Sequence, residues 1–332
     1  MLVDLKLFIR HELREITEEV KLLFDELLQK SDRYKDVLMP GYTHLQIAMP
    51  SSFGLWFGAY AESLADDMLF LQAAYRMTNR NPLGSAAGYG SSFPLNRQLT
   101  TDLLGFDSMD YNVAYAQMGR GKTERNVAFA MASVAGTLAK MAFDACLFNS
   151  QNFDFVRLPK ECTTGSSIMP HKKNPDVFEL IRAKSNKIQG LPQQIMLIMN
   201  NLPMGYFRDL QIIKEVLLPA FGELKDCLRM TAYIINKMEV NDRILENRMY
   251  DPIFSVEEVN RLVAAGVPFR DAYKKVGMDI EAGSFVSDKQ IRHIHEGSIG
   301  NLCNDRIAEL MQSILQDFHF DRVERAEKQL LS

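Results

Sequence analysis

The chain has 332 residues, enough for one large domain or two to three small ones with a substantial core. Hydrophobic residues make up 47% and charged residues 24%, a globular balance that argues against intrinsic disorder. The formal net charge of −4 provides no basic surface for a polyanion, so we expect no nucleic-acid partner.

Two long helices are predicted in the first eighty residues. Apolar residues recur every three or four positions over residues 3–30, which predicts one helix with a charged outer face. Turn-forming residues interrupt the pattern at 40–46. A helix start at Pro50-Ser51-Ser52 then precedes a second apolar-periodic stretch, residues 53–78.

The middle of the chain continues the helical pattern. Pro192 and Pro219 fall inside the last two helices and are expected to kink or split them. The stretch from about 120 to 150 is apolar around much of its circumference, which is typical of a helix buried centrally or against another subunit. The helices predicted here span residues 95–105, 120–150, 175–200 and 211–239.

Beyond residue 240 the helices become shorter and turns more frequent. We expect a mainly α fold: a central long-helix bundle for catalysis and oligomerisation at residues 1–240, and a small C-terminal helical domain at 241–332. No strand pattern and no internal repeat is evident. The shorter helices are predicted at residues 255–265, 268–276, 288–296 and 306–316.

The sequence argues against a metal site, a dinucleotide-binding loop, a membrane segment and a location outside the cytoplasm. The four scattered cysteines predict reduced thiols and a cytoplasmic location, and none has zinc-ligand spacing. His293 and His295 lie two apart, which fits a solvated turn better than a metal site. The glycine-rich residues 81–92 follow a helix instead of a strand, so they are not a dinucleotide fingerprint. We expect no metal, no cofactor, no signal peptide and no membrane partner.

The loop at residues 163–176 carries the densest chemistry in the chain. Ser166 or Ser167 could act as a nucleophile or, with Lys172 and backbone N–H groups lowering the hydroxyl pKa, as a base. Lys172 and Asn174 could hold a carboxylate and stabilise a carbanion beside it. The structural alternative is a surface loop that ends in a helix start at Asn174-Pro175-Asp176.

Two further polar clusters interrupt the helices. Thr43 and His44 lie in a turn, where a histidine could exchange protons near neutral pH or serve only a structural role. Tyr206, Gln211 and Lys214 could hold the α-carboxylate and α-amino group of an amino acid, or form a solvated helix start. Taken separately, neither cluster decides between these possibilities.

Together the clusters resemble one family. The sequence from Gly165 to Pro175 is similar to the signature of the fumarase/aspartase superfamily. Residues 40–46 and 81–85, with the Tyr206, Gln211 and Lys214 spacing, resemble its argininosuccinate lyase branch. The likeness continues to Gly266-Val267-Pro268-Phe269-Arg270-Asp271-Ala272 and so covers almost the whole chain.

The resemblance implies an elimination that releases fumarate from argininosuccinate, a step of arginine biosynthesis. It implies that Ser166 is the base and that Lys172 and Asn174 bind the succinyl carboxylate. It assigns proton transfer to His44 paired with Glu179. The remaining substrate-binding residues that it implies are Thr43, Tyr206, Gln211 and Lys214.

The resemblance also implies a homotetramer with shared active sites. Members of the family carry an N-terminal domain that ends in a Ser-Arg-Asn-Asp-Gln motif before the first long helix, and we expect that domain to be missing from this chain. Two alternatives remain open. One is another fumarate-releasing lyase, such as an adenylosuccinate lyase; the other is a truncated, weakly active or crystallin-like structural paralogue.

Overall fold

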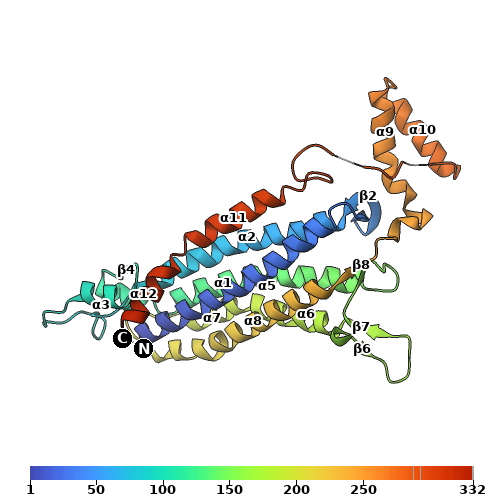
Figure 1. The fold of residues 1–332 in the computed structure, drawn as a ribbon. Coiled ribbons are helices and arrows are strands. Elements are labelled where there is room, and N and C mark those ends of the chain that lie inside the picture. The colour runs from blue at the N-terminus through green and yellow to red at the C-terminus, as the bar shows by residue number, and fades with distance from the viewer. Residues whose placement is uncertain (287, 292, 331–332) are drawn as a thin grey trace.

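The computed structural model describes residues 1–286, 288–291 and 293–330 of the chain. Long helices run side by side along one axis, and hairpins, loops and short helices cluster at the two ends of this bundle (Figure 1). The expected mainly α, long-helix architecture is confirmed. The bundle helices are α1 (Leu2–Arg33), α2 (Phe53–Thr78), α5 (Lys122–Phe148), α6 (Asp176–Gln189), α7 (Leu191–Met199) and α8 (Ile213–Lys237).

Burial of one apolar face of each helix builds a single large core. In α1 the periodic residues Leu13, Ile16 and Val20 are fully buried. Helix α1 packs between α2 and α8, while α5 packs against α2, α6, α7 and α8. The sequence pattern therefore identified the packed faces correctly.

Local sequence signals set the helix ends. The Ser52 hydroxyl accepts the Leu55 N–H at 3.1 Å, which caps the start of α2 at the predicted position. Pro192 lies in the first turn of α7, just after Gly190, where its missing N–H breaks no helical bond. Helix α8 runs unbroken through Pro219, because its apolar face is held against α1 and α6 and only one ladder bond is lost.

The expectation that no strand is present was wrong. Four two-stranded ribbons occur among the described residues, the longest being the hairpin of β1 (Leu38–Thr43) and β2 (Gln46–Ser52). Prolines and a glycine hid this hairpin from its sequence pattern. The shorter strands are β3 (Arg80–Asn81), β4 (Ser108–Met109), β5 (Val156–Arg157), β6 (Thr164–Gly165), β7 (Lys173–Asn174) and β8 (Glu239–Val240).

Short helices fill the connections between the bundle helices. The predicted helix at 95–105 is α3, and a further short helix, α4, precedes α5. The 3₁₀ turns η1 and η2 precede the hairpin of β6 and β7 and helix α8, and η3 and η4 lead out of the bundle. Their bounds are α3 (Arg97–Leu103), α4 (Val113–Met118), η1 (Lys160–Cys162), η2 (Arg208–Gln211), η3 (Ile244–Glu246) and η4 (Arg248–Phe254).

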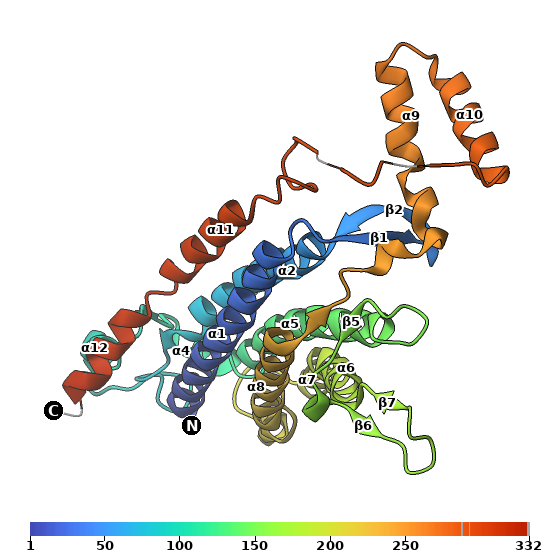
Figure 2. The ribbon, with the colours of Figure 1, turned by 45° about the vertical axis from the view of Figure 1, so that its right-hand side comes forward.

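The region after residue 240 divides into two parts. Helices α9 (Ser255–Ala264) and α10 (Phe269–Glu281) form a projecting pair with its own small cluster (Figure 2). Helix α11 (Asn304–Gln316) returns along α2 and joins the main core, and α12 (Phe320–Leu330) packs near α3. Folding of residues 241–332 as one separate domain stays a prediction, and the packing of α11 against the bundle counts against it.

The helix expected at 288–296 is absent from the described part of that range, 288–291 and 293–296. There the His293 N–H donates to the Ile299 carbonyl at 2.8 Å, closing a loop instead of a helical turn. Gly297 and Gly300 both have positive φ, which favours this turn over a helix.

Candidate active site

Ser166 lies at the start of the tip joining β6 to β7, a hairpin that projects from one end of the bundle (Figure 1). Its Oγ accepts the backbone N–H groups of Ile168 and Met169 at 3.3 and 3.1 Å. Two N–H groups aimed at one oxygen favour its negatively charged form. The tip therefore holds the Ser166 oxygen in place, and the role of Ser166 or Ser167 as a base stays a prediction.

Hydrogen bonds at its base tie this hairpin to α6. The Thr164 hydroxyl donates to the Asp176 carboxylate, and Asn174 Nδ2 donates to Thr164 Oγ1 at 3.4 Å. Asp176 opens α6, so the helix start and the hairpin are held as one unit. This fixes the direction in which the tip leaves the bundle.

A second anchor holds the segment just before β6. Glu161 in η1 accepts hydrogen bonds from Lys237 Nζ at 2.7 Å and from Tyr233 Oη at 2.9 Å. The bond from Lys237 is the main reason that the pKa of Glu161 falls to about 2. Because Lys237 ends α8, this contact fixes the hairpin at the C-terminal end of that helix.

Lys172 and Glu179 lie on the same unit, and both are exposed. The Lys172 side chain makes no hydrogen bond or ion pair within the described residues, so its ammonium group is free to meet an anion. Glu179 lies in the first turn of α6. Its expected pairing with His44 is not formed within this chain.

Thr43 and His44 are at the turn of the β1–β2 hairpin. His44 and Leu45 have φ values of 54° and 57°, the left-handed geometry of a tight two-residue turn. Tyr42, two residues before His44, packs on Phe153, which anchors the hairpin at the end of the bundle that also carries Ser166. Both views show the two hairpins on different sides of this end (Figures 1 and 2). His44 is exposed.

Tyr206, Gln211 and Lys214 gather at the opposite end of the bundle. Gln211 Nε2 donates to the Tyr206 hydroxyl at 2.7 Å. Lys214 follows in the first turn of α8, and its side chain has no partner among the residues described. The Tyr206 hydroxyl and the Gln211 amide, with the unpaired ammonium group of Lys214 nearby, could bind the carboxylate and the amino group of a ligand.

Sequence reasoning missed a buried ion pair beneath this group. Arg120 Nε donates to Glu124 Oε1 at 2.7 Å, and both side chains are only 3% exposed. A second guanidinium nitrogen donates to the Leu210 carbonyl at 2.9 Å, next to Gln211. The signal available in the sequence was an Arg and a Glu four apart at a helix start, a pattern too common to single out.

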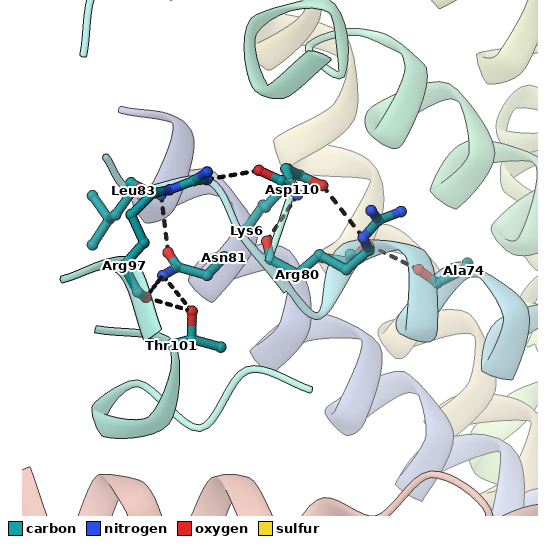
Figure 3. A network of polar contacts seen from close by, with 9 residues as sticks. Lys6, Ala74, Arg80, Asn81, Leu83, Arg97, Thr101 and Asp110 are labelled. Carbon is teal, nitrogen blue, oxygen red and sulfur yellow. Dashed lines mark hydrogen bonds and ion pairs between the residues drawn. The ribbon is translucent and has the colours of Figure 1, made fainter. Parts of the chain in front are cut away.

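Residues 81–85, the glycine-containing stretch that begins at Asn81, lie at the same end of the bundle. A buried polar network holds them (Figure 3). Lys6 Nζ donates to Asp110 Oδ2 at 2.7 Å, and Arg97 donates to the carbonyl groups of Leu83 and Asp110 at 2.8 and 2.6 Å. Asn81 Nδ2 donates to Thr101 Oγ1 at 2.9 Å. This network fixes the glycine-rich segment that begins after Asn81.

The two ends are too far apart for one small molecule to touch both. Helix α8 begins just after Gln211 and ends at Lys237, which contacts the base of the Ser166 hairpin. Its 25 residues span roughly 37 Å at 1.5 Å per residue. The predicted site residues therefore form two groups in this chain: Ser166, Lys172, Asn174, Glu179, Thr43 and His44 at one end, and Tyr206, Gln211 and Lys214 at the other.

The described residues hold one cluster with the composition of a metal site, His11, Glu12 and Glu15. Lys225 Nζ binds Glu12 at 2.9 Å and also binds Glu15, so a cation already neutralises these carboxylates. His293 instead bonds to Ser298 and Glu257, at 2.7 and 3.2 Å. Both groups are explained by ordinary hydrogen bonds and ion pairs.

One described helix, α5, has the length and mean hydropathy of a membrane-spanning segment. A central helix of a bundle meets the same criteria, and α5 packs against four other bundle helices. Its composition therefore gives no independent sign of a membrane.

Comparison with known proteins places these features in a family. Residues 1–190 match a family described as Lyase. Proteins named argininosuccinate lyase from Phocaeicola vulgatus and Bacteroides thetaiotaomicron are each 74% identical to the chain, covering 100% of it and 74% of their own length. A protein of the same name from Thermotoga neapolitana is 35% identical over 83% of the chain and 69% of its own length.

Solved structures agree on the fold. A variant of EDDS lyase with bound fumarate superposes with a TM-score of 0.86 at 21% identity, covering 98% of this chain and 74% of that one. A structure titled fumarate lyase:delta crystallin, from Brucella melitensis and bound to cobalt, has a TM-score of 0.71 at 19% identity, over 97% and 67% of the two chains. The fold is thus that of the fumarase/aspartase superfamily, and the chain belongs to the argininosuccinate lyase family.

Proposed function

We propose that this protein is a carbon–nitrogen lyase that converts argininosuccinate reversibly to L-arginine and fumarate. The observation that carries the proposal is identity of 70–74% over 331 residues with relatives named argininosuccinate lyase. That identity favours this activity over another lyase of the superfamily or a structural paralogue. The substrate is a small molecule, and the step belongs to arginine biosynthesis.

Ser166 is the proposed base. Its alkoxide removes a proton from the carbon beside a succinyl carboxylate, and the N–H groups of Ile168 and Met169 stabilise that alkoxide before the transfer. The electron pair moves into the carboxylate, giving an aci-carboxylate intermediate. Lys172 and Asn174 bind this group and stabilise its added negative charge.

His44 and Glu179 complete the elimination. When the carbon–nitrogen bond breaks, its electrons leave with the guanidinium nitrogen, and the intermediate collapses to the double bond of fumarate. His44 supplies the proton that this nitrogen takes up, with Glu179 orienting the imidazole and Thr43 contacting the substrate. The assignment of base to Ser166 and acid to His44 follows the family resemblance.

The other end of the substrate is an amino acid. Lys214 provides a cation for its α-carboxylate, and Gln211 and Tyr206 provide hydrogen bonds for the carboxylate and the α-amino group. The bond between Gln211 and Tyr206 orders both side chains before the substrate binds, which lowers the entropy lost on binding.

A homotetramer with shared active sites would bring the two groups together. The distance along α8 supports this assembly, because a complete site needs residues from opposite ends of different chains. Large apolar side chains exposed on the outside of the bundle also support it: Phe70 and Phe143 are 54% and 52% exposed, and Leu180 and Leu197 are 62% and 65% exposed. Light scattering in solution tests the tetramer.

We also propose that the protein acts in the cytoplasm, without a membrane or nucleic acid. The four cysteines, Cys146, Cys162, Cys227 and Cys303, are free thiols, as expected in a reducing compartment. The mechanism uses only side chains and backbone groups of the chain. Fractionation of cells of the source organism tests the location.

The decisive experiment measures fumarate release by its ultraviolet absorbance. Purified protein is supplied in turn with argininosuccinate and with adenylosuccinate. We expect turnover of argininosuccinate only, and turnover lost in the Ser166→Ala variant. Release from adenylosuccinate alone would transfer the assignment to that lyase. Release from neither, by a folded tetramer, would favour the structural paralogue.

A further inference from the structure

Arg120 and Glu124 form a buried pair at the end of the bundle that carries Gln211. We propose that they are positioning residues for the amino-acid end of the substrate, acting through the turn η2; this rests on the proposed function. The pair links the start of α5 to η2. Arg120 would therefore set the positions of Gln211 and Tyr206 without contacting the substrate itself.

The chain of contacts is short and continuous. Glu124 is fixed on both oxygens, since Oε2 accepts the Gly121 N–H at 2.7 Å and Oε1 accepts Arg120 Nε at 2.7 Å. Arg120 then donates to the Leu210 carbonyl at 2.9 Å. The next residue, Gln211, donates to Tyr206 at 2.7 Å.

Packing alone does not hold this turn. A cavity of about 150 Å³ is lined by Arg120 together with Met204, Phe207 and Leu210. If the guanidinium were removed, the Leu210 carbonyl would have room to move and no donor. A backbone carbonyl buried without a partner is costly, so the turn would rearrange and carry Gln211 with it.

The charge of the pair suits this role. An isolated buried guanidinium would repel the α-amino group of an amino acid, whereas Glu124 at 2.7 Å neutralises it. The pair therefore orients the turn through hydrogen bonds while adding little net field at the binding residues. Lysine could not replace the arginine fully, because it lacks the planar fork that reaches a carboxylate and a carbonyl at once.

The test separates binding of the two ends of the substrate. Inhibition constants are measured for L-arginine, for an alkylguanidine that lacks both the α-carboxylate and the α-amino group, and for succinate, using the parent protein and Arg120→Met. We expect the constant for L-arginine to rise about tenfold or more, and the other two to change less than about twofold. Gln211→Ala should give the same selective loss, and the double variant should lose little more than either single one.

Lys30 provides the matched control. It is 6% exposed and donates to the Met238 carbonyl at 2.8 Å, so it is a buried cation on a backbone carbonyl at the opposite end of α8. Lys30→Met should lower the melting temperature, as Arg120→Met does, but leave the ratio of the three inhibition constants unchanged. An equal change of that ratio in both variants would overturn the proposal, because general loosening would then explain the effect.

Arg120→Lys decides the matter if Arg120→Met does not fold. It retains a charge beside Glu124, so we expect a folded protein with selectively weaker L-arginine binding. Unchanged L-arginine binding in Arg120→Lys, with a clear loss in Gln211→Ala, would overturn the positioning role and leave the proposed function intact. A parent protein that neither turns over argininosuccinate nor binds L-arginine would instead overturn the proposed function, and this inference with it.

Discussion

Gln211 donates a hydrogen bond to the hydroxyl of Tyr206 at 2.7 Å, at the end of the bundle remote from Ser166. Tyr206 is exposed and Gln211 is half-buried, so packing alone does not order them. The same nitrogen also donates to Met1 Sδ at 3.2 Å, so these two bonds hold the amide in place. Such an arrangement is typical of a binding residue prepared for a polar ligand.

Gln211→Ala should therefore weaken substrate binding more than it slows chemistry. The amide is far from the bond that breaks, so we expect KM for argininosuccinate to rise roughly tenfold to a hundredfold and kcat to change less. Steady-state fumarate release measures both constants. Gln193→Ala, on the exposed face of α7, is the control and should change neither. A loss in kcat alone would contradict a binding role for Gln211.

Ser166→Ala should reduce turnover by roughly a hundredfold to ten-thousandfold, the range for loss of a positioned base. The melting temperature should change little, because Ser166 lies on a projecting tip and only two backbone N–H groups lose a partner. Ser167→Ala is the control, since this neighbouring hydroxyl is exposed and accepts neither bond. Equal losses in both variants would mean that the tip, and not the Ser166 oxygen, is what matters.

The sequence predicted the helices well because burial of a periodic apolar face decides them. Residues 53–78 were predicted as a helix, and α2 has those bounds, with Ser52 as its cap. Strands were missed because their pairing is not local: Pro40 pairs with Pro50, and neither residue favours a strand. No helix forms in the described residues 288–291 and 293–296, because the bond from the His293 N–H to the Ile299 carbonyl, six residues on, closes a loop that the apolar pattern did not indicate.

For the site, the sequence indicated residue types but not distances. Ser166, His44 and Gln211 were each identified as candidates, and their opposite placement along α8 could not be read from spacing. Arg120 was missed, since its importance comes from the Leu210 carbonyl, a backbone atom that any sequence supplies. The role of a residue that acts through a tertiary contact can be recognised only once the structure is known.

Asp67 provides a pH-dependent stability test in the bundle. Burial raises the pKa of this carboxyl above its ordinary value of 3.8, although Ser133 and Thr137 donate to it at 2.5 and 2.6 Å. As pH rises above 3.8 the unfolded chain releases this proton first, so the folded state loses stability until its own, higher pKa is passed. Asp67→Asn removes the titration.

We therefore expect the difference in melting temperature between Asp67→Asn and the parent to shift in favour of the variant as pH increases from about 3.8 toward neutrality. Thermal unfolding followed by circular dichroism measures this difference. Glu62→Gln, an exposed change five residues earlier on α2, should show no such trend. A shift in the opposite direction would mean that the hydroxyl donors outweigh burial at Asp67.

Two glycines in bundle helices should respond to alanine with opposite signs. A Cβ on Gly54 would lie 2.5 Å from Lys35 Cα and 2.7 Å from the Ser31 carbonyl oxygen, both backbone atoms with little freedom to move. Gly54→Ala should thus lower the free energy of unfolding by about 1–3 kcal/mol. Gly222, exposed in α8, has nothing within 4 Å of its Cβ position. There alanine should raise stability by about 0.5–1 kcal/mol.

Urea unfolding of the two variants and the parent checks both signs. Gly54→Ala as stable as the parent would show that the close approach of α2 to the end of α1 is softer than its distances indicate. Destabilisation by Gly222→Ala would show that this exposed position is covered in the assembled protein. Either result would bear on which faces of the bundle pack together.

Shared active sites predict that two variants with defects in different residues restore activity when they assemble together. Ser166 and Gln211 lie toward opposite ends of α8, a helix roughly 37 Å long, so one site draws these residues from different chains. Dissociating and reassembling the two variants in equal amounts should leave about a quarter of the sites with both residues intact. Fumarate release, measured at argininosuccinate concentrations well below the parent KM so that sites with the Gln211→Ala defect contribute little, should then recover to about that fraction of the parent rate.

The matched control mixes two variants from the same end, Gln211→Ala and Tyr206→Phe. The hydrogen bond between these residues shows that one chain supplies both, so every site in the mixture keeps at least one defect. The activity of this mixture is expected not to exceed the average activity of the two variants measured separately. Recovered activity in this control would contradict sites built from different chains. So would a lack of recovery when Ser166→Ala is mixed with Gln211→Ala. Only the separation of Ser166 from Gln211 distinguishes the two mixtures.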